Sequence, residues 1–477
     1  MTPELPTEIW LTIINYLSPA NVKRLGLVNR TFLEKARQLQ YQRLLIDKYD
    51  EKTKLRLKEI SSSSLDHYVH TLTLCVHAWP ASEQALTRWD GQIGDSFSVA
   101  AQIRSLFDSN YSQRKKLSQQ KKRLDSRIQL VLEAATAFKR VRECELRWME
   151  FLDCPPEFSS EVDFASETMS TFLSLLAIFP LRNTLTKLSL QIPTHIALNG
   201  LALVNLPLLE DLKVVLLKCQ YAWTLDSDNA ARYLGSENLA NFISGLSNTL
   251  KILSISRLDP SIDLHRDFGR LFHLLCETDF PRLLSFDFST QSPCLRRGTL
   301  SLNIFVRKIC RSIRNLQLSH LAYQTSSSPS LHNRPDHPSW ISDIISQQSR
   351  MHAFSSLTSL RIRDGHLSNN LADLSSLLAS VAHQLVSFFL EYNLLTLREV
   401  EIVVQALSRP SSPLQYLGIE PRDLSPDVFD LLASALPQLK SLSLTCERIS
   451  SSMRPDPLTE EDVRQNFPNL FFDLVST

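Results

Sequence analysis

The residues best suited to chemistry in this chain are its cysteines and two histidines that lie close together. A cysteine could act as a nucleophile beside a distant histidine, and both residue types can bind metal ions. His332 and His337 flank Asp336 in the stretch HNRPDH. The surrounding Pro-rich loop offers no rigid frame, so we interpret them as surface residues. The cysteines form no Cys-x-x-Cys pair and lie at positions 75, 144, 154, 219, 276, 294, 310 and 446. Such scattering is typical of buried, reduced thiols in a cytosolic or nuclear protein.

Motifs that would bind a substrate phosphate or form a catalytic triad are missing from the sequence. It contains no Gly-x-Gly-x-x-Gly, P-loop, Gly-x-Ser-x-Gly or His-Glu-x-x-His. Only 10 of the 477 residues are glycine, whereas phosphate-binding loops need glycine where the backbone approaches the ligand. We therefore expect no catalytic residue, no cofactor and no metal site. An enzyme on an α/β framework is the least favoured alternative.

Charge and hydropathy argue against two classes of partner. The chain has 51 basic and 50 acidic residues, whereas nucleic-acid binders depend on clustered positive charge. Its longest apolar stretch, Thr171 to Leu181, is about half of the ~20 residues that a membrane-spanning helix needs. Residues 1–10 lack the basic region of a secretory signal. We expect no nucleic acid and no membrane as partners, and a cytoplasmic and/or nuclear location.

Residues 5–45 carry the pattern of three short helices. Ser18-Pro19 is a favourable start for the second helix, and the third is expected to follow Asn29. The first helix has a wide apolar stripe made of Ile9, Trp10, Ile13, Ile14 and Leu17. Three helices of this size cannot bury so much apolar surface alone, so we expect part of it to contact a partner.

The stretch LPTEIWLTIINYLSPANVKRLGLVNRTFLEKAR, residues 5–37, resembles an F-box. The residues that match the family pattern in order and spacing are Leu5, Pro6, Glu8, Ile9, Ile13, Tyr16, Leu17, Pro19, Leu25, Leu27, Val28, Arg30 and Phe32. The chain departs from the pattern at Gly26, which falls inside the expected second helix. A second departure is that Tyr41 stands where the family often has tryptophan.

This resemblance implies docking onto the Skp-type adaptor of a cullin–RING ubiquitin ligase. The residues that it assigns to adaptor binding are Leu5, Pro6, Ile9, Ile13, Leu17, Leu25 and Val28. We expect the first five to be partly exposed in the isolated chain. The alternative is that the three helices are an ordinary cap of the larger domain.

A Leu-x-x-Leu-x-Leu motif recurs along the remainder of the chain. Clear copies start at residues 185, 209, 250, 283, 313, 357, 385, 414 and 439, and weaker ones at 69 and 141. Successive clear copies are separated by 24 residues (185 to 209) up to 44 residues (313 to 357). Helix-like segments lie between them, at 268–276, 371–382, 397–407 and 428–436. The pattern resembles a degenerate leucine-rich-repeat array, in which stacked strand–helix units bury a shared core. A helical bundle, or another α/β domain with Leu-rich strands, is the alternative.

The expected architecture is therefore α/β: an N-terminal three-helix F-box followed by an irregular solenoid with parallel strands on one face and helices on the other. We place the helical module at 1–46, a polar connector at 47–66, a helical and early-repeat region at 67–180, and the array at 181–477. A long helix is expected between residues 100 and 143. Its basic run RKKLSQQKKR, residues 114–123, is either a solvated helix face or a nuclear localisation signal.

Side chains that alternate with the inward leucines should line the exposed face of the strands. Early and middle strands place small or polar residues there, whereas late strands place Arg361, Arg363, Phe389, Glu391, Tyr416 and Glu420. Tyr and Arg are enriched among residues that dominate binding energy, so we expect these six to contact a target protein. A shift of one residue in register would reverse every assignment.

These patterns together predict a non-catalytic, substrate-recruiting subunit of a Skp–cullin–F-box ubiquitin ligase. Its partners would be a Skp-type adaptor, a cullin bound through that adaptor, and a protein substrate of unknown identity. A leucine-rich-repeat scaffold that is not linked to ubiquitin transfer is the alternative.

Overall fold

The computed structural model describes residues 5–47, 51–63, 65–77, 129, 136, 138–149, 172–173, 176–177, 181–193, 201, 204–217, 236–257, 265–290, 299–320, 340–350, 354–364, 367–409, 412–449 and 471–474. The basic run at 114–123, the histidines at 332 and 337, and nearly all of the long helix expected between 100 and 143 lie outside these ranges. Within them, no helix is long and apolar enough to cross a membrane. The same residues contain no cluster of three His, Cys, Asp or Glu side chains suited to a metal ion.

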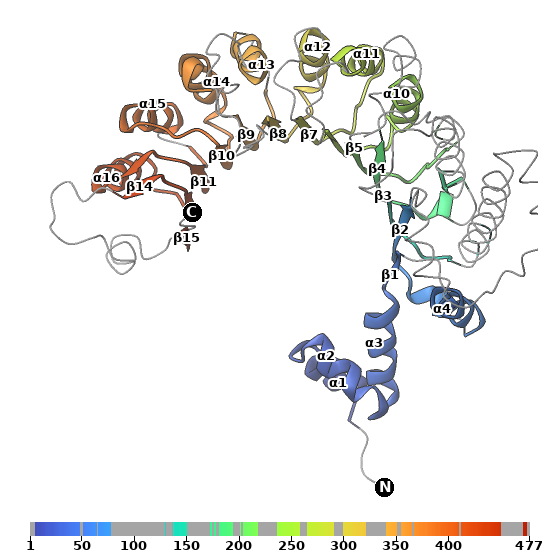
Figure 1. The fold of residues 1–477 in the computed structure, drawn as a ribbon. Helices are drawn as coiled ribbons and strands as arrows, with labels where there is room; N and C mark the ends of the chain where they lie inside the picture. The colour runs from blue at the N-terminus through green and yellow to red at the C-terminus, as the bar shows by residue number, and fades with distance from the viewer. Residues whose placement is uncertain are drawn as a thin grey trace, which may run out of the picture. The chain divides into compact units, whose positions relative to one another are not determined.

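Three helices form the N-terminal module, as the sequence predicts (Figure 1). They are α1 (Thr7–Asn15), α2 (Pro19–Arg24) and α3 (Arg30–Tyr41), with a 3₁₀ turn, η1 (Leu25–Leu27), after α2. The Ser18 side chain accepts a hydrogen bond from the Asn21 N–H, and the Asn29 side chain accepts one from the Phe32 N–H. Both residues therefore satisfy backbone donors that the first turn of a helix leaves unpaired.

The core of this module is small and consists of Ile14, Val22 and Phe32. The partly buried side chains that pack against it are Trp10, Leu17 and Leu39. Gly26 lies in the η1 turn and not inside α2, and a Cβ atom on it would come within 3.3 Å of the Ala36 Cβ. The glycine therefore allows the turn to approach α3 closely.

The chain divides into two compact units, residues 1–209 with 221–226, and residues 210–220 with 227–477. In the first unit, four parallel strands follow the helices: β1 (Arg43–Ile46), β2 (Thr71–His77), β3 (Glu143–Met149) and β4 (Lys187–Pro193). The weak motifs at 69 and 141 are thus strands. The expected connector contains α4 (Glu51–Ser62) and the turn η2 (Leu65–Tyr68). The last four residues of the range 1–46 form β1, which joins the sheet through β2.

In the second unit, parallel strands alternate with helices. The strands are β5 (Asp211–Leu217), β6 (Ile252–Arg257), β7 (Ser285–Thr290), β8 (Asn315–His320), β9 (Ser359–Arg363), β10 (Ser387–Glu391), β11 (Tyr416–Ile419), β13 (Ser441–Leu444) and β15 (Phe471–Leu474), paired in that order. Strands β12 (Asp423–Leu424) and β14 (Arg448–Ile449) form a separate parallel pair. The helices are α10 (Ser236–Gly245), α11 (His265–Leu275), α12 (Thr299–Ile309), α13 (Trp340–Ser349), α14 (Leu371–Val381), α15 (Leu397–Leu407) and α16 (Pro426–Ala435). Consecutive helices contact one another on one side of the strands (Figure 1).

Each clear copy of the leucine motif forms a strand, and the four expected helices are present. The predicted α/β class, with N-terminal helices followed by a repeat array of parallel strands and helices, is confirmed. The motif's apolar side chains are buried between the strands and the helices: Leu360 and Ile362 on β9, for example, and Phe388 and Leu390 on β10. Aromatic rings add to this core, as where Phe288 packs edge-on against Trp340 at 5.2 Å.

Candidate functional site

Helix α1 carries two apolar stripes on different faces. Ile14 belongs to the core of the helical module, and Trp10 on α1 and Leu17 just after it pack against that core. Ile9 and Ile13, which lie one turn apart, are 46% and 37% exposed. An amphipathic helix in a globular protein normally has one apolar stripe and a polar opposite face. The second stripe is therefore available to a partner.

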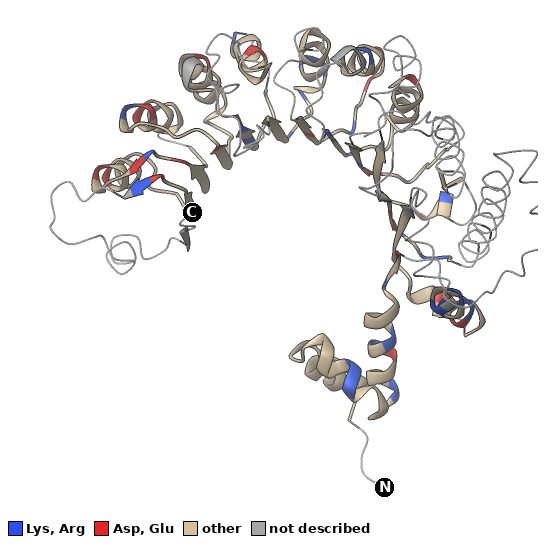
Figure 2. Ribbon diagram, viewed as in Figure 1, with Lys and Arg blue, Asp and Glu red and all other residues tan. Residues whose placement is uncertain are grey.

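Further exposed apolar side chains come from both ends of α1 and from the turn after α2. Leu27 and Tyr16 are 95% and 87% exposed, respectively. We call the set that continues the Ile9–Ile13 stripe the F-box apolar face, which comprises Leu5, Ile9, Ile13, Tyr16, Leu25, Leu27 and Val28. The ribbon of α1 and α2 is mostly uncharged in Figure 2, in contrast to the densely charged α4. Exposed apolar residues gathered in this number mark an interaction surface.

The residues predicted for adaptor binding mostly lie on this face. Leu5, Pro6, Ile9, Ile13, Leu25 and Val28 are exposed. Leu17 is half-buried and packs against the core, so its contribution is mainly structural. Sequence reasoning did not select Tyr16 and Leu27 for adaptor binding. Tyr16 and Leu27 match the F-box pattern, and that match was the available signal.

The second candidate site is the late-repeat patch, which comprises Arg361, Arg363, Phe389, Glu391, Tyr416 and Glu420. Five of the six lie on the adjacent strands β9, β10 and β11, and Glu420 directly follows β11. All six are at least partly exposed, whereas the side chains between them on the strands are buried. The predicted register is therefore correct, and Phe389 does not belong to the core.

Phe389 rests on the backbone of the neighbouring strand. Phe389 pairs with Arg361 on one side and with Gly418 on the other. A Cβ atom on Gly418 would lie 2.2 Å from Cδ1 of Phe389, so only glycine leaves space for the ring in this position. The guanidinium carbon of Arg361 lies 4.5 Å from the ring centroid, within the range of a cation–π interaction.

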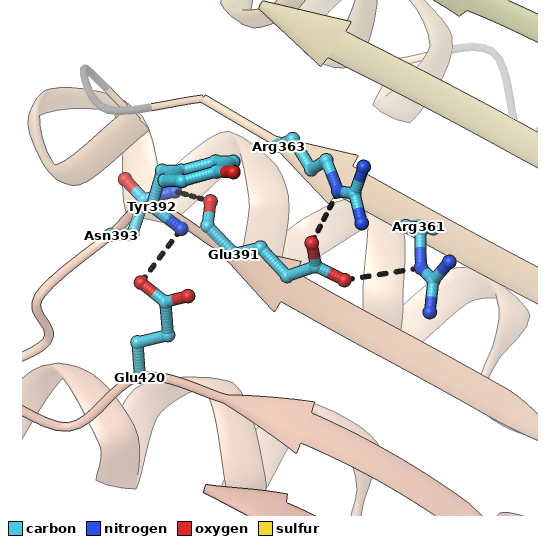
Figure 3. Close-up of polar contacts among 6 residues, drawn as sticks. All are labelled: Arg361, Arg363, Glu391, Tyr392, Asn393 and Glu420. Carbon is cyan, nitrogen blue, oxygen red and sulfur yellow. Dashed lines mark hydrogen bonds and ion pairs between the residues drawn. The ribbon is translucent and has the colours of Figure 1, made fainter. Parts of the chain in front are cut away.

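Glu391 joins the two arginines of the patch (Figure 3). Its Oε1 lies 3.2 Å from Nε of Arg361, and its Oε2 accepts a hydrogen bond from Nε of Arg363. Both guanidinium groups are thus held in place by one carboxylate, and their repulsion is offset. Both contacts with Glu391 are made through Nε of the arginines.

The turn after β10 has an unusual backbone. Tyr392 has φ = 63°, and no other described residue, glycine included, has a positive φ. Its backbone N–H donates a hydrogen bond to Oε2 of Glu420 at 2.7 Å (Figure 3). The side-chain amide of the buried residue Asn393 donates a hydrogen bond to the backbone carbonyl of Glu391 at 3.3 Å. These bonds hold a conformation that is costly for a residue with a side chain.

Two carboxylates near the arginines are partly removed from water. Burial raises the pKa of Glu420, although its hydrogen bond from Tyr392 acts in the opposite direction. Burial also raises the pKa of Asp287 on β7. The hydroxyl of Ser254 donates a hydrogen bond to Oδ2 of Asp287 at 3.0 Å, and this bond acts in the opposite direction on the pKa. Asp287 offsets the charge of both Arg361 and Arg363, whereas Glu420 offsets that of Arg363.

Comparison with known protein families gives a match over the segment that contains the first candidate site. Residues 3–41 match the F-box domain family, so this chain carries an F-box domain ahead of its repeat array. No curated protein matches the chain. A solved structure, the crystal structure of the Rad7 and Elc1 complex in yeast, is similar at 14% sequence identity over 80% of this chain and 98% of that chain. Its TM-score is 0.24, and a likeness at this level carries no conclusion about this protein.

Proposed function

We propose that this protein is a substrate-recruiting subunit of a Skp–cullin–F-box type ubiquitin ligase. The observation that carries the proposal is the second apolar stripe of α1, which is exposed within a segment that matches the F-box domain. A Skp-type adaptor would cover the F-box apolar face, and a cullin would join through the adaptor. The protein itself supplies binding, and ubiquitin transfer to the target results from proximity to other subunits. Such a role places it in the cytoplasm, the nucleus or both.

A binding measurement with the full chain and a purified Skp-type adaptor tests this proposal. In the variant Ile9→Asp with Ile13→Asp, two apolar side chains that would be buried are replaced by carboxylates. Burying one Ile contributes ~1.5–3 kcal/mol, so affinity should fall by about 100-fold or more. Leu300→Asp on α12 is the matched control, because Leu300 is 64% exposed and lies in the other unit. Unchanged affinity in a folded double variant would refute the proposal.

We propose that the late-repeat patch contacts the target protein. The support is its composition and rigidity: an aromatic ring, a tyrosine and two fixed arginines lie on adjacent strands about 4.8 Å apart. Proximity labelling of wild type and Arg363→Glu with Phe389→Ala tests the assignment. The control combines Lys440→Glu with Leu300→Ala, which make the same kinds of change at exposed positions of the same unit. The patch variant should lose captured proteins that the control retains, and an unchanged set would refute the assignment.

A further inference from the structure

The turn that follows β10 places an exposed aromatic residue on a costly backbone. Tyr392 has φ = 63°, whereas Gly26, Gly245 and Gly418, the glycines of the described segments, have no positive φ. A left-handed backbone is unfavourable for tyrosine, while glycine adopts it freely and asparagine tolerates it. The fold alone would therefore favour glycine at this position, which indicates that the tyrosine side chain has a role of its own.

The ring of Tyr392 contributes little to the core. It is 53% exposed, and its hydroxyl makes no hydrogen bond with any residue that the structure describes. The bonds that hold the turn come from other groups (Figure 3). The backbone N–H of Tyr392 donates to Glu420, and the side-chain amide of Asn393 donates to the carbonyl of Glu391. A glycine in place of Tyr392 would keep both bonds.

Two leucines beside Tyr392 are also exposed. Leu394 is 42% exposed, and Leu397, the first residue of α15, is 38% exposed. We call Tyr392, Leu394 and Leu397 the rim cluster. The equivalent turns after β11 and β13 instead expose charged residues, which are Arg422, Asp423, Glu447 and Arg448. Apolar exposure is thus a property of this particular turn and marks it as a contact surface.

The rim cluster lies between fixed points of the backbone. The N–H of Leu395 donates to the carbonyl of Glu420 at 2.8 Å, and the carbonyl of Leu395 accepts from the N–H of Arg422 at 2.7 Å. The capping box of Thr396 and Glu399 then fixes the start of α15. A surface that is already ordered loses less conformational entropy when a partner binds.

We propose that the rim cluster binds a large apolar side chain of the target protein, and that Tyr392 determines this preference. The inference rests on the proposed role of the late-repeat patch, with which the rim is continuous. Glu391 of the patch directly precedes Tyr392, and Glu420 of the patch holds its backbone. An exposed tyrosine offers a rigid ring and is enriched among residues that dominate binding energy. The target would thus place an apolar residue just beyond the carboxyl end of β10.

Stability and binding should respond in opposite directions to changes at Tyr392. Tyr392→Gly and Tyr392→Asn relieve the strained backbone, so urea denaturation should show a folded-to-unfolded ratio that is raised by about threefold or more. Tyr392→Phe keeps both the ring and the strain and should match wild type. A loss of stability in Tyr392→Gly and Tyr392→Asn would show that the side chain serves the core, and would overturn the proposal.

Binding is measured with a defined probe, a phage library of random short peptides selected on the full wild-type chain. Peptides that lose affinity for Arg363→Glu with Phe389→Ala are kept, and these should carry a large apolar residue. Tyr392→Gly should weaken their binding by about 10-fold or more, whereas Tyr392→Phe should retain it. Leu394→Ala should weaken it as well, and Leu300→Ala, at an exposed leucine on α12, is the matched control.

The outcomes separate this inference from the proposed function. Patch-dependent peptides that bind Tyr392→Gly as tightly as wild type would overturn the rim proposal and leave the target patch standing. Selection of no patch-dependent peptide would overturn both. Patch-dependent peptides that require Tyr392, in a chain that binds no Skp-type adaptor, would support the rim proposal and refute the ligase assignment.

Discussion

At the scale of single residues, Gly418 determines the shape of the late-repeat patch. Its missing side chain lets Phe389 lie across β11, where the ring supports the guanidinium group of Arg361. Arg361 in turn contacts Glu391, which also holds Arg363. A change at the glycine should therefore reach the two arginines through contacts that are all on the exposed face of the strands.

Gly418→Ala should destabilise the protein through Phe389. The added methyl group cannot coexist with the ring in its present place, so the ring must move off β11, at a cost of about 1–3 kcal/mol. In a Phe389→Ala background the same replacement should cost much less, because the ring is gone. Equilibrium denaturation of wild type, Gly418→Ala, Phe389→Ala and the double variant measures the coupling free energy between the two positions. Equal costs in both backgrounds would contradict the described packing.

Cys144 should be unreactive in the folded protein. Burial, with a smaller contribution from the charge of Glu145, raises the pKa of its thiol from 9.0 to about 12. The folded state therefore favours the neutral thiol, and the stability contributed by this group is complete below pH 9 and falls as the pH rises above it. At pH 8, iodoacetamide should modify Cys144 far more slowly than the half-buried Cys446, as peptide mass spectrometry would show. Equal rates in the folded chain would argue against the burial of Cys144.

At the scale of elements, α1 separates stability from binding on its two faces. Ile14 is buried, and its neighbour Ile13 is exposed. Ile14→Ala should cost about 2–4 kcal/mol and speed hydrogen–deuterium exchange throughout α1. Ile13→Ala should leave exchange unchanged and weaken adaptor binding instead. Faster exchange in Ile13→Ala, comparable to that in Ile14→Ala, would show that the two faces have been assigned incorrectly.

Helix α15 depends on a capping box. The Thr396 hydroxyl accepts from the Glu399 N–H, and the Glu399 carboxylate accepts from the Thr396 N–H at 2.7 Å. Thr396→Ala should lower the free energy of unfolding by about 1 kcal/mol, whereas Thr396→Ser retains the hydroxyl and should change it little. Denaturant titration distinguishes the two variants. An equal loss in both would mean that the cap does not stabilise the helix.

The sequence predicts most elements because buried leucines recur with strand and helix spacing. The leucine motif does not predict the strands β1 and β15, and the reason is the same for both strands. The first motif position holds Tyr41 before β1 and Asn469 before β15, so the leucine pattern is incomplete. Tyr41 also belongs to the apolar pattern of α3, which hides the start of the first repeat. Only the pairing of Leu44 with Leu72 reveals it.

At the scale of the whole molecule, the chain combines an F-box domain with a long repeat array. The positions of both candidate sites could be predicted, because the F-box motif and strand alternation are local patterns. The contacts within the late-repeat patch could not be predicted from the sequence. The bridging role of Glu391 and the position of Phe389 on Gly418 depend on which side chains face each other on neighbouring strands, and a whole helix separates each of these strands from the next in the sequence.

Co-capture of a cullin by the full chain is the most direct test of the account. A deletion of residues 1–46 would also remove β1 from the sheet, so the substitution pair Ile9→Asp with Ile13→Asp is the cleaner comparison. Wild type and the Leu300→Asp control should each recover both a Skp-type adaptor and a cullin from cell extract. The folded double variant should recover neither. Recovery of both partners by the double variant, or of neither by wild type, would contradict the proposal that this protein is a ligase subunit.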